Sequence, residues 1–194
     1  MNTIDYYNKN AAQYYNKTVE MGMEYIIEEF IKYIPADGAI LDLGCGSGRD
    51  SVYFMEEGFD VTSIDGSKEL CELAKIEIGQ EVHNIMFEDL EFENVFDGVW
   101  ACASLLHVKK SEIHNILQKI SRSLVDNGVL YMSLKHGDFE GVRDDRYYAD
   151  YRTGEIKEIL KKIPEFEILA MYTKRREKTD KQSWLNIFVR KNPL

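Results

Sequence analysis

A glycine-rich stretch, LDLGCGSGRDS at residues 41–51, is the first segment whose composition indicates chemistry. It follows an apolar run and precedes a segment with helical periodicity. Glycine permits a tight turn and lets a ligand lie directly against the backbone. A dinucleotide-binding loop has the spacing G-x-G-x-x-G, whereas Gly44, Gly46 and Gly48 follow G-x-G-x-G. The early third glycine predicts a nucleotide-like ligand without a pyrophosphate at this point.

Two carboxylates follow, at the ends of the next two predicted strands. Asp65 lies 21 residues after Gly44, where it can accept hydrogen bonds from ribose hydroxyls. Asp89 can accept one from an adenine amino group. Taken alone, Asp65 also fits a helix N-cap and Asp89 a turn. Because the carboxyl ends of parallel strands meet at one edge, the loop and both acids together predict an adenosine site.

The four histidines divide according to their place along the predicted strands. His83 begins a strand and His114 lies on a helix, so both are interpreted as structural. His107 and His136 follow the fourth and fifth strands, at the edge where the ligand is expected. Histidine titrates near neutral pH, which suits a general base. His107 is the first candidate for a catalytic base and His136 the second; a hydrogen-bonded loop histidine is the alternative for each.

A long insert separates the fifth strand from the helix expected at residue 153. Long loops within compact domains are frequently functional, and we predict a substrate cap over residues 136–152. Arginine suits carboxylate or phosphate groups and tyrosine provides flat walls, so we expect the cap to recognise an anionic or aromatic small molecule. A surface turn with a local ion pair is the alternative. The insert carries Arg143, Arg146, Tyr147, Tyr148 and Tyr151.

Apolar strands alternate with helices from residue 38 onward, which predicts βαβ units. The expected strands are 38–44, 59–65, 83–89, 96–104, 128–135, 166–176 and 183–191. The expected helices are 22–34, 47–58, 67–79 (with Ser67 as its N-cap), 110–124 and 153–163. The fold class is therefore α/β, a doubly wound, Rossmann-like, mainly parallel seven-stranded sheet with helices on both faces. The last two strands are joined by the turn KTDK, which makes the final strand antiparallel.

The motifs LDLGCGSG, VTSIDGSKELCELAK, FED and FDGVWACASLLHV, in this order, resemble the class I S-adenosylmethionine-dependent methyltransferases. The loop GSGRDSVYF further resembles small bacterial enzymes of the tellurite-resistance and thiopurine methyltransferase type. The resemblance implies S-adenosylmethionine as cofactor. It also implies contacts with the methionine moiety from Asp42, Gly44, Cys45, Gly46 and Arg49, with the ribose and adenine from Asp65, Gly66, Ser67, Asp89 and Leu90, and with the methyl donor from Ala103.

Tyrosines are frequent in the first 21 residues, where Tyr6 and Tyr7 precede Tyr14 and Tyr15 by two helical turns. In several members of the resembling family an N-terminal helix folds over the cofactor. Residues 1–21 are therefore interpreted as a helix that forms a lid, with Tyr14 as a candidate substrate contact. Ordinary amphipathic packing is the alternative.

The fourth motif, ACASLLHV, restricts the acceptor. It lacks the Asp/Asn-Pro-Pro-aromatic element with which the resembling enzymes hold planar amino groups, and it lacks a Pro-Cys nucleophile. We therefore expect in-line methyl transfer to an N, O or S atom of a small molecule. The alternatives are a protein or RNA methyltransferase and a non-catalytic, S-adenosylmethionine-binding regulatory subunit.

Composition limits the remaining classes. The 194 residues suit a single domain, 1–194. A net charge of −10 disfavours binding to nucleic acid, which depends on lysine and arginine. The chain has no long apolar run and its three cysteines match neither a disulfide framework nor a metal site, so we expect a cytoplasmic protein without membrane partners or a bound metal. The oligomeric state stays open.

Overall fold

A computed structural model of the chain describes residues 2–175 and 181–193. Its main sheet contains β1 (Ala39–Leu43), β2 (Asp60–Asp65), β3 (Val82–Asn84), β4 (Phe96–Ala101), β5 (Leu124–Lys135), β8 (Phe166–Arg175) and β9 (Ser183–Lys191). The spatial order is β3-β2-β1-β4-β5-β9-β8. Strands β3 to β5 are parallel, and β9 runs antiparallel to both β5 and β8. The predicted seven-stranded sheet with a reversed last strand is confirmed.

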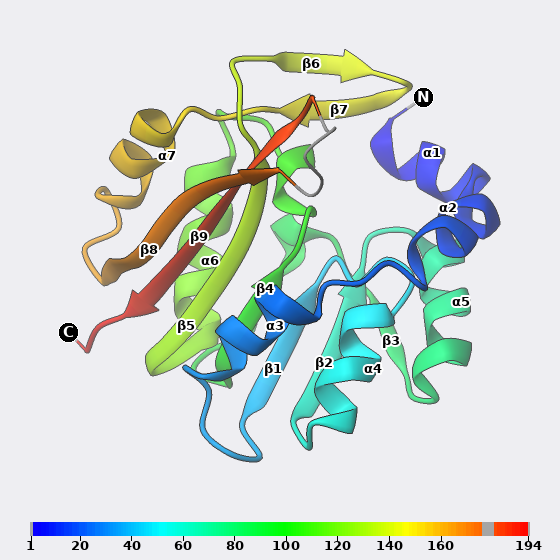
Figure 1. Cartoon of the computed structure of the whole chain (residues 1–194), viewed down its shortest axis with the longest axis horizontal. Coiled ribbons are helices and arrows are strands. Elements are labelled where there is room, and N and C mark those ends of the chain that lie inside the picture. Colours follow the sequence, from blue (N-terminus) through cyan, green and yellow to red (C-terminus); the bar gives the residue numbers. More distant parts are fainter. Residues whose placement is uncertain (1, 176–180, 194) are drawn as a thin grey trace.

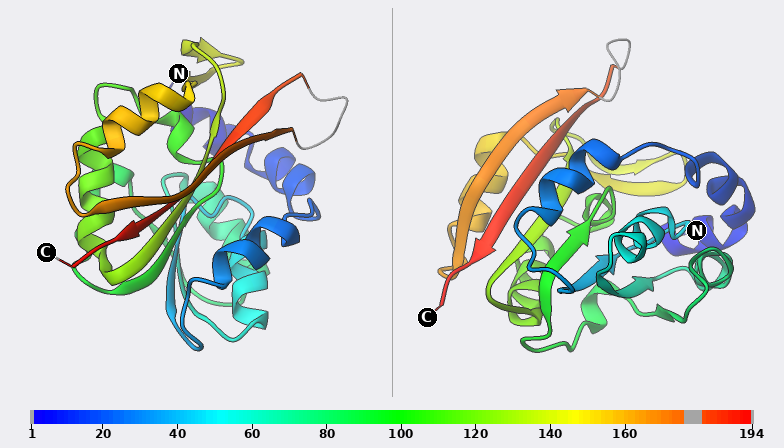
Figure 2. Two further views of the ribbon diagram at one scale, coloured as in Figure 1. Left: turned by 60° about the vertical axis from the view of Figure 1, so that its left-hand side comes forward. Right: turned by 60° about the horizontal axis from the view of Figure 1, so that its bottom comes forward.

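Helices cover both faces of this sheet (Figures 1 and 2). They are α3 (Glu24–Ile31), α4 (Arg49–Glu56), α5 (Lys68–Ile78), α6 (Ile113–Ser123) and α7 (Thr153–Leu160). On one face, Phe30 of α3 and Phe54 of α4 pack against Trp100 and Tyr131 of the central strands. On the other face, α6 and α7 bury their apolar sides against the alternate residues of the same strands. Burial on both faces explains why the central strands are almost continuously apolar.

The helix that follows β2 begins at the predicted cap. The Ser67 Oγ accepts a hydrogen bond from the Leu70 N–H, and the left-handed Gly79 ends the helix. The start of α5 is therefore fixed immediately after Asp65, so the end of β2 and the first turn of α5 form one rigid corner.

The N-terminal segment forms two helices where the sequence predicted one. They are α1 (Thr3–Lys9) and α2 (Ala11–Thr18). The chain bends at Asn10, whose side-chain amide donates to the carbonyl of Tyr6 at 2.8 Å. The backbone N–H of Asn10 donates to the same carbonyl at 3.0 Å, so Asn10 closes the last turn of α1 with both its backbone and its side chain.

The insert after β5 is a β-hairpin, whereas the sequence suggested an irregular loop. Strands β6 (Glu140–Arg143) and β7 (Arg146–Ala149) are antiparallel, and Asp144 and Asp145 join them with φ of 51° and 60°. Two left-handed residues make the turn that matches the twist of a hairpin, and aspartate tolerates this conformation better than most residues.

Two predicted strands are shorter in the structure. The expected strand 83–89 forms β3 only as far as Asn84, because its partner β2 ends at Asp65 and leaves the chain without a neighbour to pair with. A 3-10 turn, Phe87–Asp89, follows. The expected strand 96–104 ends at Ala101, and the chain then turns through Ala103 at a φ of 53°. Most of the predicted turn KTDK lies outside the described residues.

Helices α1 and α2 lie over the carboxyl ends of the parallel strands together with the hairpin, and they are called the lid below because of this position. In Figure 1 the hairpin crosses the top of the sheet and its turn lies beside α1. The Tyr147 N–H donates to Thr3 Oγ1 at 2.9 Å, which joins β7 to the first turn of α1. Within the described residues, every helix is too short or too polar to cross a membrane.

Candidate active site

The glycines of the loop between β1 and α4 face different parts of the structure. Gly46 and Gly48 have φ of 59° and 83°, a left-handed conformation that favours glycine. A Cβ on Gly46 would lie 3.1 Å from the ring of Tyr14, whereas one on Gly48 would lie 2.8 Å from the side chain of Ile78. The early third glycine therefore lets the loop pack on α5, and Gly46 faces the lid.

Asp65 joins the end of β2 to this loop. One carboxylate oxygen accepts from the Gly46 N–H at 3.0 Å and the other from the Ser67 N–H at 2.8 Å. The carboxyl group is buried, and this burial raises its pKa while the two backbone N–H groups oppose the rise. Each carboxylate oxygen has a second lone pair, so Asp65 can accept further hydrogen bonds from a ligand.

A buried polar network supports the loop from below. Asp42 accepts from the Ser51 hydroxyl at 2.6 Å, and its pKa is raised by burial and by the charge of Asp50. Asp50 accepts from Arg49 and from the indole N–H of Trp100 at 2.8 Å. Asp42 and Arg49 therefore hold the loop in shape from behind.

The lid is attached to the loop and to α5 by polar contacts. Asn8 Oδ1 accepts from the Ser67 hydroxyl at 2.8 Å and from the Glu69 N–H at 3.3 Å. At the other end of the lid, Arg49 donates to the carbonyl of Thr18 at 3.3 Å. The same residues that cap α5 and flank the glycine loop therefore also hold α1 and α2 in place.

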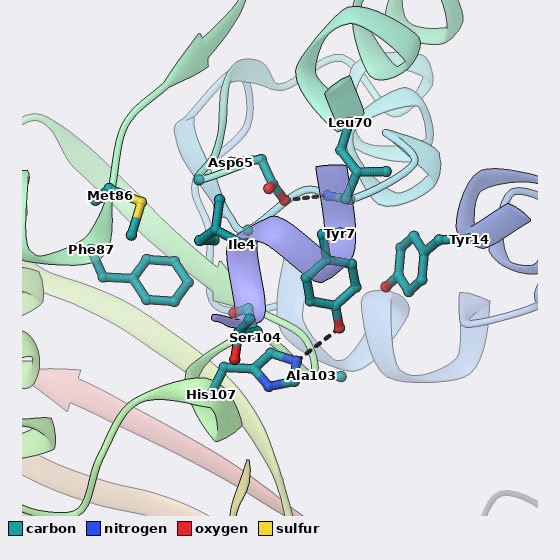
Figure 3. A pocket seen from close by; sticks show the side chains of 14 residues that line it. Ile4, Tyr7, Tyr14, Asp65, Leu70, Met86, Phe87, Ala103, Ser104 and His107 are labelled. Atoms are coloured by element: carbon teal, nitrogen blue, oxygen red, sulfur yellow. Dashed lines mark hydrogen bonds between the residues drawn. The ribbon is translucent and has the colours of Figure 1, made fainter. Parts of the chain in front are cut away.

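The first pocket lies between the loop, the lid and the strand ends (Figure 3). It contains about 530 Å³ of empty space including its mouth. Apolar side chains of Ile4, Leu70, Met86 and Phe87 form one end, and Asp65 lies beside them. The full lining is Thr3, Ile4, Tyr7, Tyr14, Gly44, Gly46, Asp65, Gly66, Leu70, Met86, Phe87, Ala103, Ser104 and His107.

A second pocket adjoins the first and shares four of its lining residues, Tyr7, Tyr14, Ala103 and His107. It holds about 980 Å³ of empty space, again including its mouth. The residues that line the second pocket alone are Tyr6, Asn10, Gln13, Lys17, Thr18, Met21, Leu106, Lys135, Arg146, Tyr148 and Trp184. These four residues are called the shared wall below. A molecule bound in the first pocket and a molecule bound in the second would come closest to each other at this wall.

His107 forms part of that wall and is held in one tautomer. Its Nδ1 lies 2.6 Å from the carbonyl of Tyr147, which can only accept, so Nδ1 carries the proton. Its Nε2 therefore accepts from the hydroxyl of Tyr7 at 2.8 Å, as Figure 3 shows. Burial, together with the charges of Arg146 and Lys135, lowers the pKa of His107 to about 4, against the hydrogen bond to Tyr147. The imidazole is neutral near pH 7.

Several predicted residues come together here and others do not. Tyr14, Gly44, Gly46, Asp65, Gly66, Ala103 and His107 all line the first pocket, and Arg146 lines the second. His136 lies outside the lining of both pockets, and its backbone bridges to Tyr151. Asp89 is exposed, and Arg143 pairs with Asp150 at 3.4 Å. Cys45 and Leu90 are buried in the core.

Three residues that line the pockets, Lys135, Ser104 and Trp184, were not predicted from the sequence. Lys135 ends the predicted fifth strand beside His136, so its position at the ligand edge was readable from the sequence. Ser104 directly follows Ala103, so its position at this edge could equally have been predicted from the sequence. Trp184 comes opposite Lys135 through the antiparallel register of β5 and β9, which the sequence does not specify.

The fold and the pocket at its strand ends define a Rossmann-like, nucleotide-binding class of protein. A family profile described as a methyltransferase domain matches residues 40–128. YqeM, named as a methyltransferase of Bacillus subtilis (strain 168), is 32% identical over 126 residues, 60% of this chain and 51% of YqeM. An uncharacterized methyltransferase of Staphylococcus carnosus (strain TM300) is 26% identical over 78% of each chain.

Among solved structures, a 1,6-didemethyltoxoflavin-N1-methyltransferase of Burkholderia thailandensis has a TM-score of 0.79. It is 22% identical, and the match covers 98% of this chain and 87% of that one. Residues 40–128 therefore form a methyltransferase domain by their family profile, and the chain is similar in sequence and in fold to S-adenosylmethionine-dependent methyltransferases. Because the match spans about half of YqeM, the family relationship leaves the activity and the substrate of this chain to be argued from its own site.

Proposed function

We propose that the protein binds S-adenosylmethionine in the first pocket and transfers its methyl group to a small molecule in the second. The observation that carries this proposal is the shared wall of Tyr7, Tyr14, Ala103 and His107, where donor and acceptor would meet. Holding two reactants in line at such a wall is worth up to about 7–11 kcal/mol of the barrier.

The residues of the first pocket fit this cofactor. A Cβ on Gly66 would lie 2.8 Å from Ile4 and 2.9 Å from Met86, so these two apolar side chains pack directly against the backbone of Gly66. Asp65 stands beside it with lone pairs for ribose hydroxyls. The buried hydroxyl of Ser104 has no hydrogen-bond partner among the described residues, which suits a polar ligand group.

S-adenosylmethionine supplies a methyl group on a sulfonium, and the carbon–sulfur bonding pair stays on sulfur as the acceptor bonds to the methyl carbon. The chain's own residues manage the acceptor's proton. We assign His107 Nε2 as the base, acting through Tyr7: the acceptor proton passes to the Tyr7 oxygen as the phenolic proton passes to His107. A positioned base contributes about 10²–10⁴-fold, and the lowered pKa of His107, about 4, places its contribution at the low end of this range.

Calorimetry with S-adenosylmethionine, S-adenosylhomocysteine and NAD tests the donor site. We expect both sulfur compounds to bind and NAD not to bind. Asp65→Ala should weaken S-adenosylhomocysteine binding at least about tenfold, since it removes a charged acceptor. Asp60→Ala, at the exposed opposite end of the same strand, is the matched control and should bind normally.

The proposal would be overturned if the protein bound NAD but neither S-adenosylmethionine nor S-adenosylhomocysteine. Turnover is tested separately, as release of S-adenosylhomocysteine in the presence of candidate acceptors. A protein that binds the cofactor tightly but releases no product with any small molecule, peptide or RNA would instead be the regulatory subunit considered above.

A further inference from the structure

The second pocket is cationic although the protein as a whole carries a charge of −10. Lys17, Lys135 and Arg146 line it, and none of the described residues in its lining is an aspartate or glutamate. The lining otherwise consists largely of aromatic rings and neutral polar groups. An acidic protein that gathers uncompensated positive charge at one concave site favours an anionic ligand there.

The guanidinium of Arg146 is positioned by aromatic rings at this pocket. Its guanidinium lies over the rings of Tyr6 and Tyr148, with Cζ 4.6 and 5.3 Å from their centroids. The Nε atom is buried without a hydrogen-bond partner among the residues that the structure describes. Stacking fixes the plane of the guanidinium, which lines the pocket and can donate its N–H groups to an acceptor there.

Lys135 adds a second cation on the same aromatic residue. Its Nζ lies 3.9 Å from the ring centroid of Tyr148. Burial and the charges of Arg143 and Arg146 lower the pKa of Lys135, while Asp150 acts in the opposite direction. Asp150 is itself paired with Arg143. Two neighbouring cations that are partly desolvated together are costly unless a negative charge neutralises them.

The geometry points to an acceptor that is a small aromatic carboxylate, with its acid group held by Arg146 and Lys135 and its ring between tyrosine side chains. The carboxylate matches the planar fork of arginine, and the rings of Tyr6 and Tyr14 provide flat walls. The ring would then reach the wall of Tyr7 and His107, where methyl transfer is proposed. This inference rests on the proposed function for the identity of the other pocket's ligand.

Matched pairs of aromatic acids and their amides test the charge requirement directly. Benzoate, 4-hydroxybenzoate, anthranilate and phenylacetate are titrated into the protein saturated with S-adenosylhomocysteine, and each is compared with its carboxamide. At least one acid should bind at least about tenfold more tightly than its amide, since a charged hydrogen bond is lost in the amide. Arg146→Gln should abolish that difference, and Lys135→Gln should reduce it.

Lys9→Gln is the control, because Lys9 is exposed on α1 and lies outside the lining of both pockets. It removes the same charge and should preserve the preference for acids. S-adenosylhomocysteine affinity is measured for every variant, which shows that each one folds. If no acid binds more tightly than its amide while S-adenosylhomocysteine still binds, the anionic acceptor is refuted and the proposed function stands. Failure to bind S-adenosylhomocysteine would refute the proposed function itself.

Discussion

Replacing His107 tests whether its buried imidazole is neutral in the folded protein. The imidazole is held neutral by burial, with a pKa of about 4 against an ordinary value of 6.5. Between these two pH values the unfolded chain binds a proton that the folded protein does not. Stability therefore falls as the pH drops below 6.5, and the loss is complete below pH 4.

The size of this loss follows from the two pKa values. Each tenfold difference in proton affinity corresponds to about 1.4 kcal/mol. At pH 5 the linkage amounts to about 2 kcal/mol of unfolding free energy, and at pH 4 to about 3 kcal/mol. These losses should be absent from His107→Gln, whose side chain is uncharged yet can still donate and accept hydrogen bonds. The other titrating groups are common to both proteins and cancel in the comparison.

Urea unfolding of wild type and His107→Gln at pH 7.5, 6 and 5 measures the difference. The variant is expected to be less stable at pH 7.5, and the gap should narrow or reverse by about 2 kcal/mol at pH 5. His83→Gln, at an exposed position of β3, should follow the wild-type profile. If wild type and His107→Gln lose stability in parallel over this range, His107 is not a buried neutral base and the role assigned to it falls.

Two further substitutions address the loop and the lid. Gly46→Ala should cost about 1–2 kcal/mol of stability and weaken S-adenosylhomocysteine binding, because alanine resists a φ of 59° and its methyl would press on Tyr14. Gly154→Ala, where an added methyl meets nothing within 4 Å, should be neutral in thermal melting; equal behaviour of the two variants would contradict the loop geometry. Asn8→Ala should weaken S-adenosylhomocysteine binding about three- to tenfold by loosening α1, whereas the exposed Asn16→Ala should not; equal affinity in calorimetry would show that closure does not depend on this contact.

The donor side of the site was largely predictable because its residues lie next to regular elements. Gly46 and Ala103 follow strands that the apolar pattern reveals and Asp65 ends one, and parallel strands bring such positions to one edge. Asp89 is an exception to this rule. The strand before it stops at Asn84, and the following turn leaves Asp89 exposed, since pairing length depends on the neighbouring strand.

The acceptor side was less predictable because it depends on contacts between distant segments. Tyr7 and His107 are 100 residues apart, and the sequence gives no register between a lid helix and a loop after β4. His136 follows its strand as His107 does, yet its backbone pairs with Tyr151 and Ser183 at the edge of the sheet. The position after a strand therefore indicates the correct edge of the sheet, but not whether a side chain faces the ligand.

The two pockets also differ in how many of their residues lie in the region shared with relatives. The region that matches the family profile, residues 40–128, includes Asp65, Ala103 and His107 of the proposed donor site and shared wall. The cations and rings that distinguish the second pocket lie outside that region, on α1, α2, β5, β7 and β9. Residues outside the profile region can change without disturbing the glycine loop and the strand ends proposed to hold the cofactor. The choice of acceptor in this protein therefore has to be determined from Lys135, Arg146 and their neighbours, because the motifs that identify the family do not contain them.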